Sequence, residues 1–190
     1  GKNSPVTICN SALIKVGGRV ISSLDDPSKE ARLCKEQFRK NFEALISEHP
    51  WNFGKKRIVL NPDPEKSAWG DFNVFTLPSD CTRPIETSLD EYPERYTIEG
   101  NKILSKDATF GILYISLETD PSLFSESFCE LLSLRIAADI CYSIVQSRTL
   151  KLDLKKEYSD YIAQVRSFNA QEGGQQTFTN EGSGFLQSRL

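Results

Sequence analysis

The chain has 190 residues, of which 38% are hydrophobic and 26% are charged, and its formal net charge is −3. This length suits one domain with a sizeable core, or one domain with a subsidiary layer. No uncharged apolar run approaches the roughly 20 residues that span a bilayer, and no hydrophobic signal region follows the first residues. We therefore expect neither a membrane protein nor a protein secreted through a signal peptide.

Charge is distributed unevenly along the chain. Residues 1–60 carry 11 Lys and Arg against 6 Asp and Glu, a net charge of +5, whereas residues 61–190 carry 12 against 20, a net charge of −8. Such asymmetry favours head-to-tail contact between identical subunits, although two solvated faces are the simpler explanation.

The N-terminal part carries the signals of two helices. Ser4 followed by Pro5 predicts a short first helix that ends near Gly17, and residues 19–24 form a connector with some strand character. Asp26, followed by a proline, predicts the start of a longer helix, which Pro50 ends after about six turns. Its apolar residues share one stripe and are Ala31, Cys34, Phe38, Phe42, Leu45 and Ile46. Trp51 and Phe53 follow, and we expect them to fix the exit of the chain from this helix.

The middle of the chain changes to short extended segments bounded by turn residues. The predicted strands are 56–60, 72–77, 83–88, 95–99, 102–104 and 112–117. Gly100 and Asn101 predict a hairpin between the fourth and fifth of these. Short connections of this kind favour an antiparallel sheet over a parallel one.

Two further helices and a tail complete the predicted organisation. Asp120 and a proline predict a third helix that runs to about residue 146 and is apolar on most sides, and a fourth is expected from about 149 to 170. The predicted fold class is α+β, with an antiparallel sheet inserted between the second and third of about four helices. Its parts are a helical bundle (1–54 and 120–172), a β region (55–119) and a flexible C-terminal docking arm (173–190).

Few residues suggest chemistry. His49 is the sole histidine, and no pair among Cys9, Cys34, Cys81, Cys129 and Cys141 has zinc-site spacing, so we expect no metal and no cofactor. We interpret the cysteines as reduced core residues and His49 as a group that satisfies carbonyls at the helix end. A Cys–His nucleophile pair remains an alternative, because its members can be distant in sequence.

A basic segment, Lys55, Lys56 and Arg57, lies beside Trp51 and Phe53, and it is a candidate contact with DNA or with a neighbouring subunit. The chain as a whole is acidic, and residues 61–119 hold 5 basic against 11 acidic side chains. This balance disfavours a sequence-specific DNA-binding protein.

Five segments in the same order resemble the head-to-tail adaptor family of short-tailed bacteriophages, also called tail tubular protein A. They are residues 21–26 (ISSLDD), 49–53 (HPWNF), 77–83 (LPSDCTR), 120–124 (DPSLF) and 171–173 (QEG). Together they run through most of the chain, which makes the resemblance more specific than any single segment. The resemblance implies a structural virion protein without catalytic activity.

The resemblance also implies partners and a location. The protein is expected to form a homo-oligomeric ring of about twelve copies below the portal protein, assembled in the host cytoplasm and located in the tail or neck of the virion. The ring would continue the DNA ejection conduit to a nozzle similar to tail tubular protein B, with possible tail-fibre contacts and non-specific contact with passing DNA. Phe178, Phe185, Leu186 and Arg189 are the candidate portal-docking residues of the arm. Two alternatives stay open: a small cytosolic or tail-associated Cys/His enzyme, and a nucleic-acid-binding module.

Overall fold

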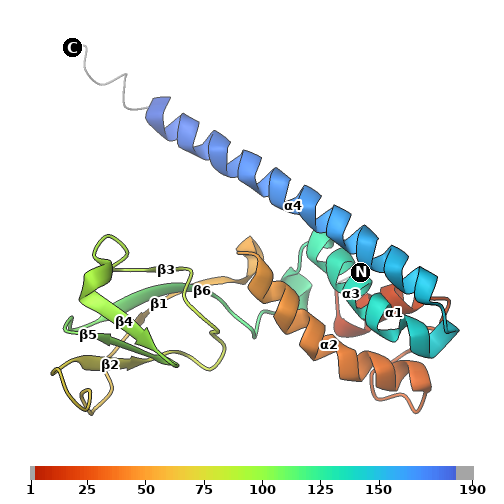
Figure 1. The fold of residues 1–190 in the computed structure, drawn as a ribbon, viewed down its shortest axis with the longest axis horizontal. Helices are drawn as coiled ribbons and strands as arrows, with labels where there is room; N and C mark the ends of the chain where they lie inside the picture. Colours follow the sequence, from red (N-terminus) through yellow and green to blue (C-terminus); the bar gives the residue numbers. More distant parts are fainter. Residues whose placement is uncertain (1–2, 183–190) are drawn as a thin grey trace. The chain divides into compact units, whose positions relative to one another are not determined.

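The computed structural model describes the backbone of residues 3–182 and the side chains of residues 3–169. The described part is mixed α+β, with four α-helices and two antiparallel sheets of three strands each, which confirms the predicted fold class (Figure 1). It divides into two compact units. We call residues 1–3 and 42–125 the β unit, and residues 4–41 and 126–190 the helical unit.

The helical unit is built around α3 (Glu126–Val145), which packs against α1 (Pro5–Lys15) and α4 (Arg148–Gly182). The prediction that this helix is buried on most sides is confirmed. Its buried side chains are Phe128, Leu131, Leu132, Ser133, Leu134, Ile136, Ala137, Ala138, Ile140 and Cys141. A helix that is apolar all round needs neighbours on several faces, and α1 and α4 supply two of them.

The start of α1 is confirmed, but the predicted cap of the next helix, α2 (Lys29–Glu48), is wrong. Ser28 Oγ accepts the Ala31 amide at 3.1 Å and so caps α2. The carboxylate of Asp26 instead accepts the amides of Ser22 (2.8 Å) and Ser23 (3.1 Å). Asp26 therefore stabilises the turn before α2, because its carboxylate bonds the amides of that turn and not those at the start of the helix.

The connector over residues 19–24 forms no strand. Ile21 donates its amide to Asn10 Oδ1 at 2.8 Å, and Asn10 Nδ2 donates to the Ile21 carbonyl at 2.9 Å. The Asn10 amide thus replaces the neighbouring strand that an extended residue would otherwise need, and Ile21 is buried without joining a sheet.

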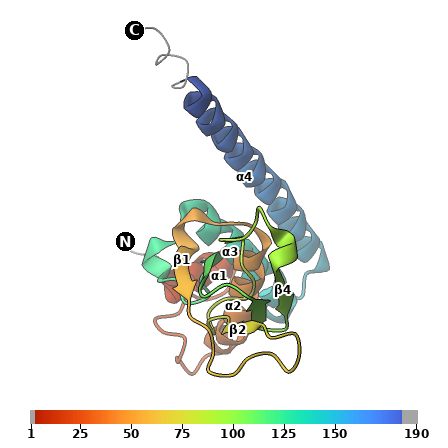
Figure 2. The same cartoon turned by 90° about the vertical axis from the view of Figure 1, so that its left-hand side faces the viewer.

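The strands of the β unit form two sheets rather than one. The first has the order β1 (Lys55–Leu60), β6 (Phe110–Ile115), β3 (Glu86–Thr87), and the second has the order β2 (Asn73–Thr76), β5 (Lys102–Ser105), β4 (Tyr96–Glu99). Every pairing is antiparallel, and the predicted hairpin between β4 and β5 is confirmed, with Gly100 at a φ of +61°. Strands β1, β2 and β4 are labelled in Figure 2.

Both sheets contribute one face to a common core. Alternation along a strand places every second side chain on the same face, so β6 contributes Phe110, Ile112 and Tyr114. The second sheet contributes Phe75 and Ile103, which are register partners. The buried members of this core are Phe75, Leu77, Leu89, Ile103, Phe110, Ile112 and Tyr114.

Three short 3₁₀ turns link these elements: η1 (Asn52–Gly54), η2 (Pro93–Arg95) and η3 (Pro121–Leu123). The third corrects the predicted start of α3. Asp120 accepts the Ser122 amide at 2.9 Å and caps η3, whereas α3 itself begins at Glu126. The capping chemistry predicted for Asp120 is present, but it serves a separate turn.

The fourth helix, α4, continues to Gly182, beyond the predicted end near residue 170. A glycine inside a helix costs only about 1 kcal/mol relative to alanine, so Gly173 and Gly174 need not end one. In Figure 1 the C-terminal part of α4 runs past the end of α3. The side chains of the predicted arm over 173–190, and residues 183–190 altogether, lie outside the described part.

The two units meet in sequence inside α2, between residues 41 and 42, rather than at the end of that helix. The reason is aromatic packing at its last turns. Phe42 stacks on Phe124 with ring centroids 5.6 Å apart, and Phe124 lies 5.5 Å from Phe53. These contacts attach the end of α2 to the β unit.

Candidate functional site

An aromatic cluster in the β unit lies where the chain leaves α2. Trp51 is 4% exposed, and its Nε1 donates to the Leu45 carbonyl at 3.1 Å. Its ring lies 5.9 Å from Phe53 and 4.9 Å from His49, which meets it edge to face. Trp51 is therefore buried at the exit, as the sequence predicted, and His49 packs against its ring.

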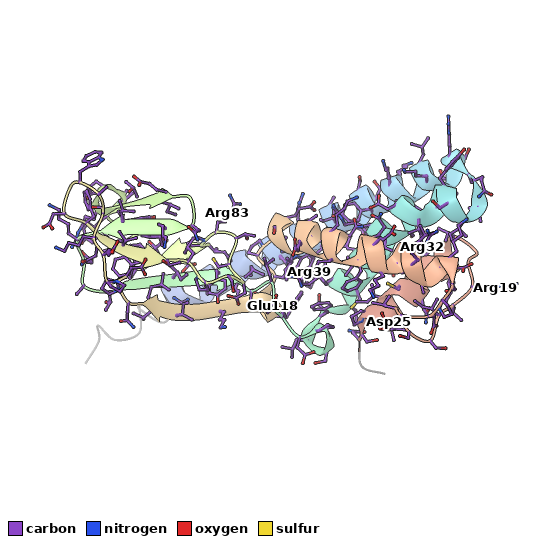
Figure 3. All side chains as sticks on the ribbon, turned by 90° about the horizontal axis from the view of Figure 1, so that it is seen from below. Arg19, Asp25, Arg32, Arg39, Arg83 and Glu118 are labelled. Carbon is purple, nitrogen blue, oxygen red and sulfur yellow. The ribbon has the colours of Figure 1, made fainter. Side chains whose placement is uncertain are left out.

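A cavity of about 390 Å³ adjoins this cluster, and we call it the β-unit cavity. Its apolar lining includes Ile46, Pro50, Ile85, Ile115 and Leu117, and its polar lining includes Glu48, His49, Thr82 and Arg83. Arg83 projects outward from its loop (Figure 3). The lining is about equally polar and apolar, and the volume lies in the range of pockets that hold a small molecule.

The β-unit cavity has no thiol among its lining residues. Cys81 precedes Thr82 of the lining, and burial, together with the charge of Asp80, raises the pKa of its thiol to about 11. Such a thiol stays protonated at neutral pH, whereas a nucleophilic cysteine needs the thiolate. The geometry thus gives His49 no activated cysteine as a neighbour within the described lining.

Asp80 joins the irregular segment before the cavity to strand β6. Its carboxylate accepts hydrogen bonds from Ser116 Oγ at 2.6 Å and from the Tyr114 hydroxyl at 3.1 Å, and Lys56 Nζ lies 3.9 Å away. Burial opposes ionisation of Asp80, but these hydrogen bonds and the lysine charge outweigh it and hold its pKa below the ordinary value. Burial and the Asp80 hydrogen bond raise the pKa of Tyr114 to about 12.

The predicted basic segment lies on β1, where strand alternation divides it. Lys55 and Arg57 share the face that also presents Val59, whereas Lys56 is on the face directed toward Asp80. All three side chains of the segment are exposed. Only Lys55 and Arg57 can therefore act together on a partner, and they lie on the first sheet, whose central strand also provides Ile115 of the cavity lining.

The helical unit has a second cavity, of about 350 Å³, beside a polar network between helices. Asn41 donates to Asp139 at 2.9 Å and accepts from Arg135 Nε at 3.3 Å, so it bridges two residues that lie one turn apart on α3. Arg135 also donates to the Tyr158 hydroxyl at 3.0 Å, and Lys40 lies 3.5 Å from Asp139. The network joins α2, α3 and α4, and each charged member has an opposite or polar partner.

The cysteines are all free, and three of them, Cys9, Cys34 and Cys141, are buried. The hydrogen bond to Cys34, followed by burial, raises the pKa of Cys9. Burial also raises the pKa of Cys129, to about 11. The hydrogen bond with Cys9 lowers the pKa of Cys34, which is buried. The predicted core role is thus confirmed for Cys9, Cys34 and Cys141, whereas Cys81 and Cys129 are half-buried.

Among the described residues, no group of three or more His, Cys, Asp or Glu side chains is placed to hold a metal ion. The described helices include none with the length and apolar character that crossing a membrane requires. The candidate docking residues Phe178, Phe185, Leu186 and Arg189 lie outside the described side chains.

The sequence did not point to the β-unit cavity or to the loop over residues 61–72, which presents Trp69 with 85% of its surface exposed. A signal for that loop was available, because proline, glycine and charged residues surround a tryptophan far from any apolar run. No local sequence pattern marks the β-unit cavity, because its lining residues come from three separate segments of the chain.

Comparison with known proteins adds no assignment. No protein-family model matches the chain, and no curated protein is significantly similar to it.

Proposed function

We propose that this chain is a structural virion protein without catalytic activity, a head-to-tail adaptor that forms a ring between the portal and the tail nozzle of a short-tailed phage. The proposal is supported by the five segments that resemble the adaptor family in the same order along the chain. An assembly protein of this type needs rigid surfaces and a connection to each partner rather than reacting groups.

The observation that carries the proposal is the role of the polar and aromatic residues in those segments. Trp51 donates to a helix carbonyl, Asp80 accepts hydrogen bonds from Tyr114 of β6 and from Ser116, and Asp120 caps η3. Each of these residues therefore has a structural partner inside the β unit. Residues that build a scaffold in this way support an adaptor better than an enzyme.

The charge of the β unit suits a conduit that does not retain DNA. This unit has fourteen Asp and Glu against nine Lys and Arg, whereas the helical unit has twelve against fourteen. An acidic lining repels phosphate, so a passing duplex would make only weak, non-specific contacts, with Lys55 and Arg57 as the exposed basic group.

Attachment to the portal is assigned to the end of α4 and the residues after it. Phe178, Phe185 and Leu186 are the proposed apolar anchors, with Arg189 beside them. Several weakly binding arms that engage one portal ring would hold the assembly by avidity. The nozzle, and tail fibres where present, would contact other surfaces of the ring.

The experiment is removal of residues 175–190 from the full chain, followed by cosedimentation with isolated portal rings. We expect the melting transition of the free protein to change little, since Leu154 and Ile162, the buried apolar residues of α4 in the described part, are retained, while attachment to the portal is lost. A matched full-length variant with serine at Phe185 and Leu186 separates loss of the anchors from loss of length. Cosedimentation of the truncated chain at the level of the full chain would refute the docking assignment.

The enzyme alternative has less support from the described residues. Cys81 and Cys129, the two half-buried thiols, both have a pKa raised to about 11, and the other three are buried. Replacing His49 and each cysteine by alanine or serine should therefore affect phage infectivity only through folding. Loss of a catalytic turnover in a folded, assembled variant would reverse this preference.

A further inference from the structure

We propose that Cys9 and Cys34 are a disulfide-forming pair, which joins α1 to α2 covalently in an oxidising environment. Both residues belong to the helical unit, where α1 and α2 are labelled in Figure 1, and their thiols are hydrogen-bonded to each other. The inference goes beyond the adaptor role and rests on it only for its setting. A virion protein is made in the reducing cytosol of the host and is later released from it.

Both side chains lie in the interior of the helical unit. Cys9 shares the buried side of α1 with Ala12 and Leu13, and Cys34 follows the buried Ala31 of α2 by about one turn. Both cysteines are completely buried. Two hydrogen-bonded sulfur atoms need to approach by only about 1–2 Å to reach the roughly 2.05 Å of an S–S bond. The fold thus brings the two thiols almost to bonding distance.

The hydrogen bond also gives the two thiols different roles. Together with burial it raises the pKa of Cys9, and it lowers the pKa of Cys34 against the opposing effects of burial and of the Glu30 charge. The shared proton therefore stays on Cys9, and Cys34 is the sulfur that more readily carries negative charge. Because the thiolate is the form that attacks a disulfide, we assign the first attack to Cys34.

The reaction needs an oxidant, and a small disulfide such as oxidised glutathione supplies it. The Cys34 thiolate attacks one sulfur of oxidised glutathione, whose S–S bond breaks and releases one glutathione thiolate. The Cys9 thiol then loses its proton and attacks the Cys34 sulfur of the mixed disulfide, and the second glutathione leaves. The two protein thiols together lose two electrons and two protons, and oxidised glutathione becomes two glutathione thiols.

Burial determines when this exchange takes place. Glutathione reaches neither thiol in the closed helical unit, so it reacts while the chain folds or when the unit opens locally. The same burial shields the finished disulfide from reducing agents. We therefore expect the folded chain to be oxidised slowly and a refolding chain to be oxidised faster.

The other three cysteines lack such a partner thiol in their described surroundings. Cys141 is equally buried, but its thiol donates to a backbone carbonyl at 3.5 Å. Burial and a nearby carboxylate raise the pKa of Cys81 and of Cys129 to about 11. Cross-linking is therefore expected between Cys9 and Cys34 and not at the other cysteines.

The cross-link would close a loop around the connector between α1 and α2. Residues 16–28 of this connector form neither helix nor strand. A disulfide between Cys9 and Cys34 closes a loop of about 25 residues, which lowers the conformational entropy of the unfolded chain. We expect it to raise the midpoint of thermal unfolding by roughly 5–10 °C.

The experiment maps disulfides in the full chain after refolding from urea in a buffer of mainly oxidised glutathione. Free thiols are then alkylated, the chain is digested with trypsin, and the peptides are weighed by mass spectrometry. We expect one dominant cross-link, between the peptides of residues 3–15 and 33–35, with about 2 Da less than the two reduced peptides together. In a buffer of mainly reduced glutathione, all five thiols should be alkylated.

Alanine variants supply the controls. Cys141→Ala is the matched control, because it removes an equally buried thiol and should leave the yield of the cross-link unchanged. Cys9→Ala and Cys34→Ala should each abolish it. Oxidation should raise the thermal midpoint of the wild-type chain and of Cys141→Ala, and it should leave the other two variants unchanged. Circular dichroism establishes that each variant is folded, and the map of the wild-type chain does not depend on them.

Four results would overturn the inference: free thiols at Cys9 and Cys34 in the oxidised buffer, a mixed disulfide with glutathione as the end product, equally frequent cross-links to other cysteines, or a cross-link that forms equally in the reduced buffer. Cosedimentation with portal rings separates this inference from the proposed function. A chain that forms the cross-link but does not bind portals would remove the adaptor role and retain the disulfide. A chain that binds portals while both thiols resist oxidation would do the reverse.

Discussion

The two units differ in how they accommodate buried polar groups. In the β unit, Asp80 gathers hydroxyl donors from Tyr114 and Ser116 and so attaches an irregular segment to one strand. In the helical unit, Asn41 is 3% exposed and bridges Arg135 and Asp139, which links α2 to α3. One network fixes loops to a sheet, and the other fixes helices to one another.

The proposed assembly requires a fixed conformation mainly in the β unit. The β unit holds the exposed Trp69, the cavity and the acidic excess, and its irregular segments must be held in one conformation for those surfaces to be reproducible. The helical unit buries most sides of α3, so apolar packing contributes much of its stability. Substitutions on the surface of the first unit can therefore separate stability from assembly, whereas substitutions among the packed helices of the second should mainly change stability.

The largest expected effect on stability is at Trp51, and Trp69 of the same unit provides the contrast. Trp51→Ala removes a buried ring and its hydrogen bond to Leu45, and it should lower the free energy of unfolding by roughly 3–5 kcal/mol. Trp69→Ala removes an exposed ring and should stay within about 0.5 kcal/mol of wild type. Urea denaturation measures both, and similar losses for the two variants would contradict the contrast.

Asp80→Asn should have the next largest effect, roughly 2–3 kcal/mol at neutral pH, because hydrogen bonds to a carboxylate are replaced by bonds to a neutral amide. The folded pKa of Asp80 lies below its unfolded value, so its contribution is present above about pH 3.9 and is lost as pH falls below that. Denaturation at several pH values should show less acid sensitivity for the variant than for wild type. Equal acid sensitivity would mean that Asp80 does not carry this dependence.

Asn41→Ala tests the corresponding network of the helical unit. It removes the bridge between Arg135 and Asp139, and we expect a loss of about 2 kcal/mol with no change in self-association. A double-mutant cycle with Asp139→Ala should show coupling, because the two side chains share a hydrogen bond at 2.9 Å. Additive losses in that cycle would place the stabilisation elsewhere.

A loss of stability smaller than those at Trp51, Asp80 and Asn41 is expected at the turn between β4 and β5. Gly100 has a φ of +61° and open space around its α-carbon, so alanine meets backbone strain but no clash. Gly100→Ala should therefore cost about 1 kcal/mol, measured by the same urea titration. No loss at all would indicate that the turn relaxes to accept a side chain.

Local chemistry in the sequence was sufficient for many elements. Ser4 and Pro5 start α1, Pro50 ends α2, and Gly100 turns the hairpin, because each of these effects depends on residues within a few positions. The α+β class followed from the change of periodicity between the helical and strand segments.

Tertiary structure decided what depends on distant residues. The sequence offers Trp51 and Trp69 in similar surroundings of polar and turn residues, yet one is 4% exposed and the other 85%. The difference arises because Trp51 follows α2 and meets the Phe53 and Phe124 cluster, the latter some seventy positions away, whereas the loop of Trp69 closes on itself. Burial of a side chain depends on contacts between segments that are distant in sequence. Only the tertiary structure therefore decided the cavity, the division of the strands into two sheets and the exposure of Trp69.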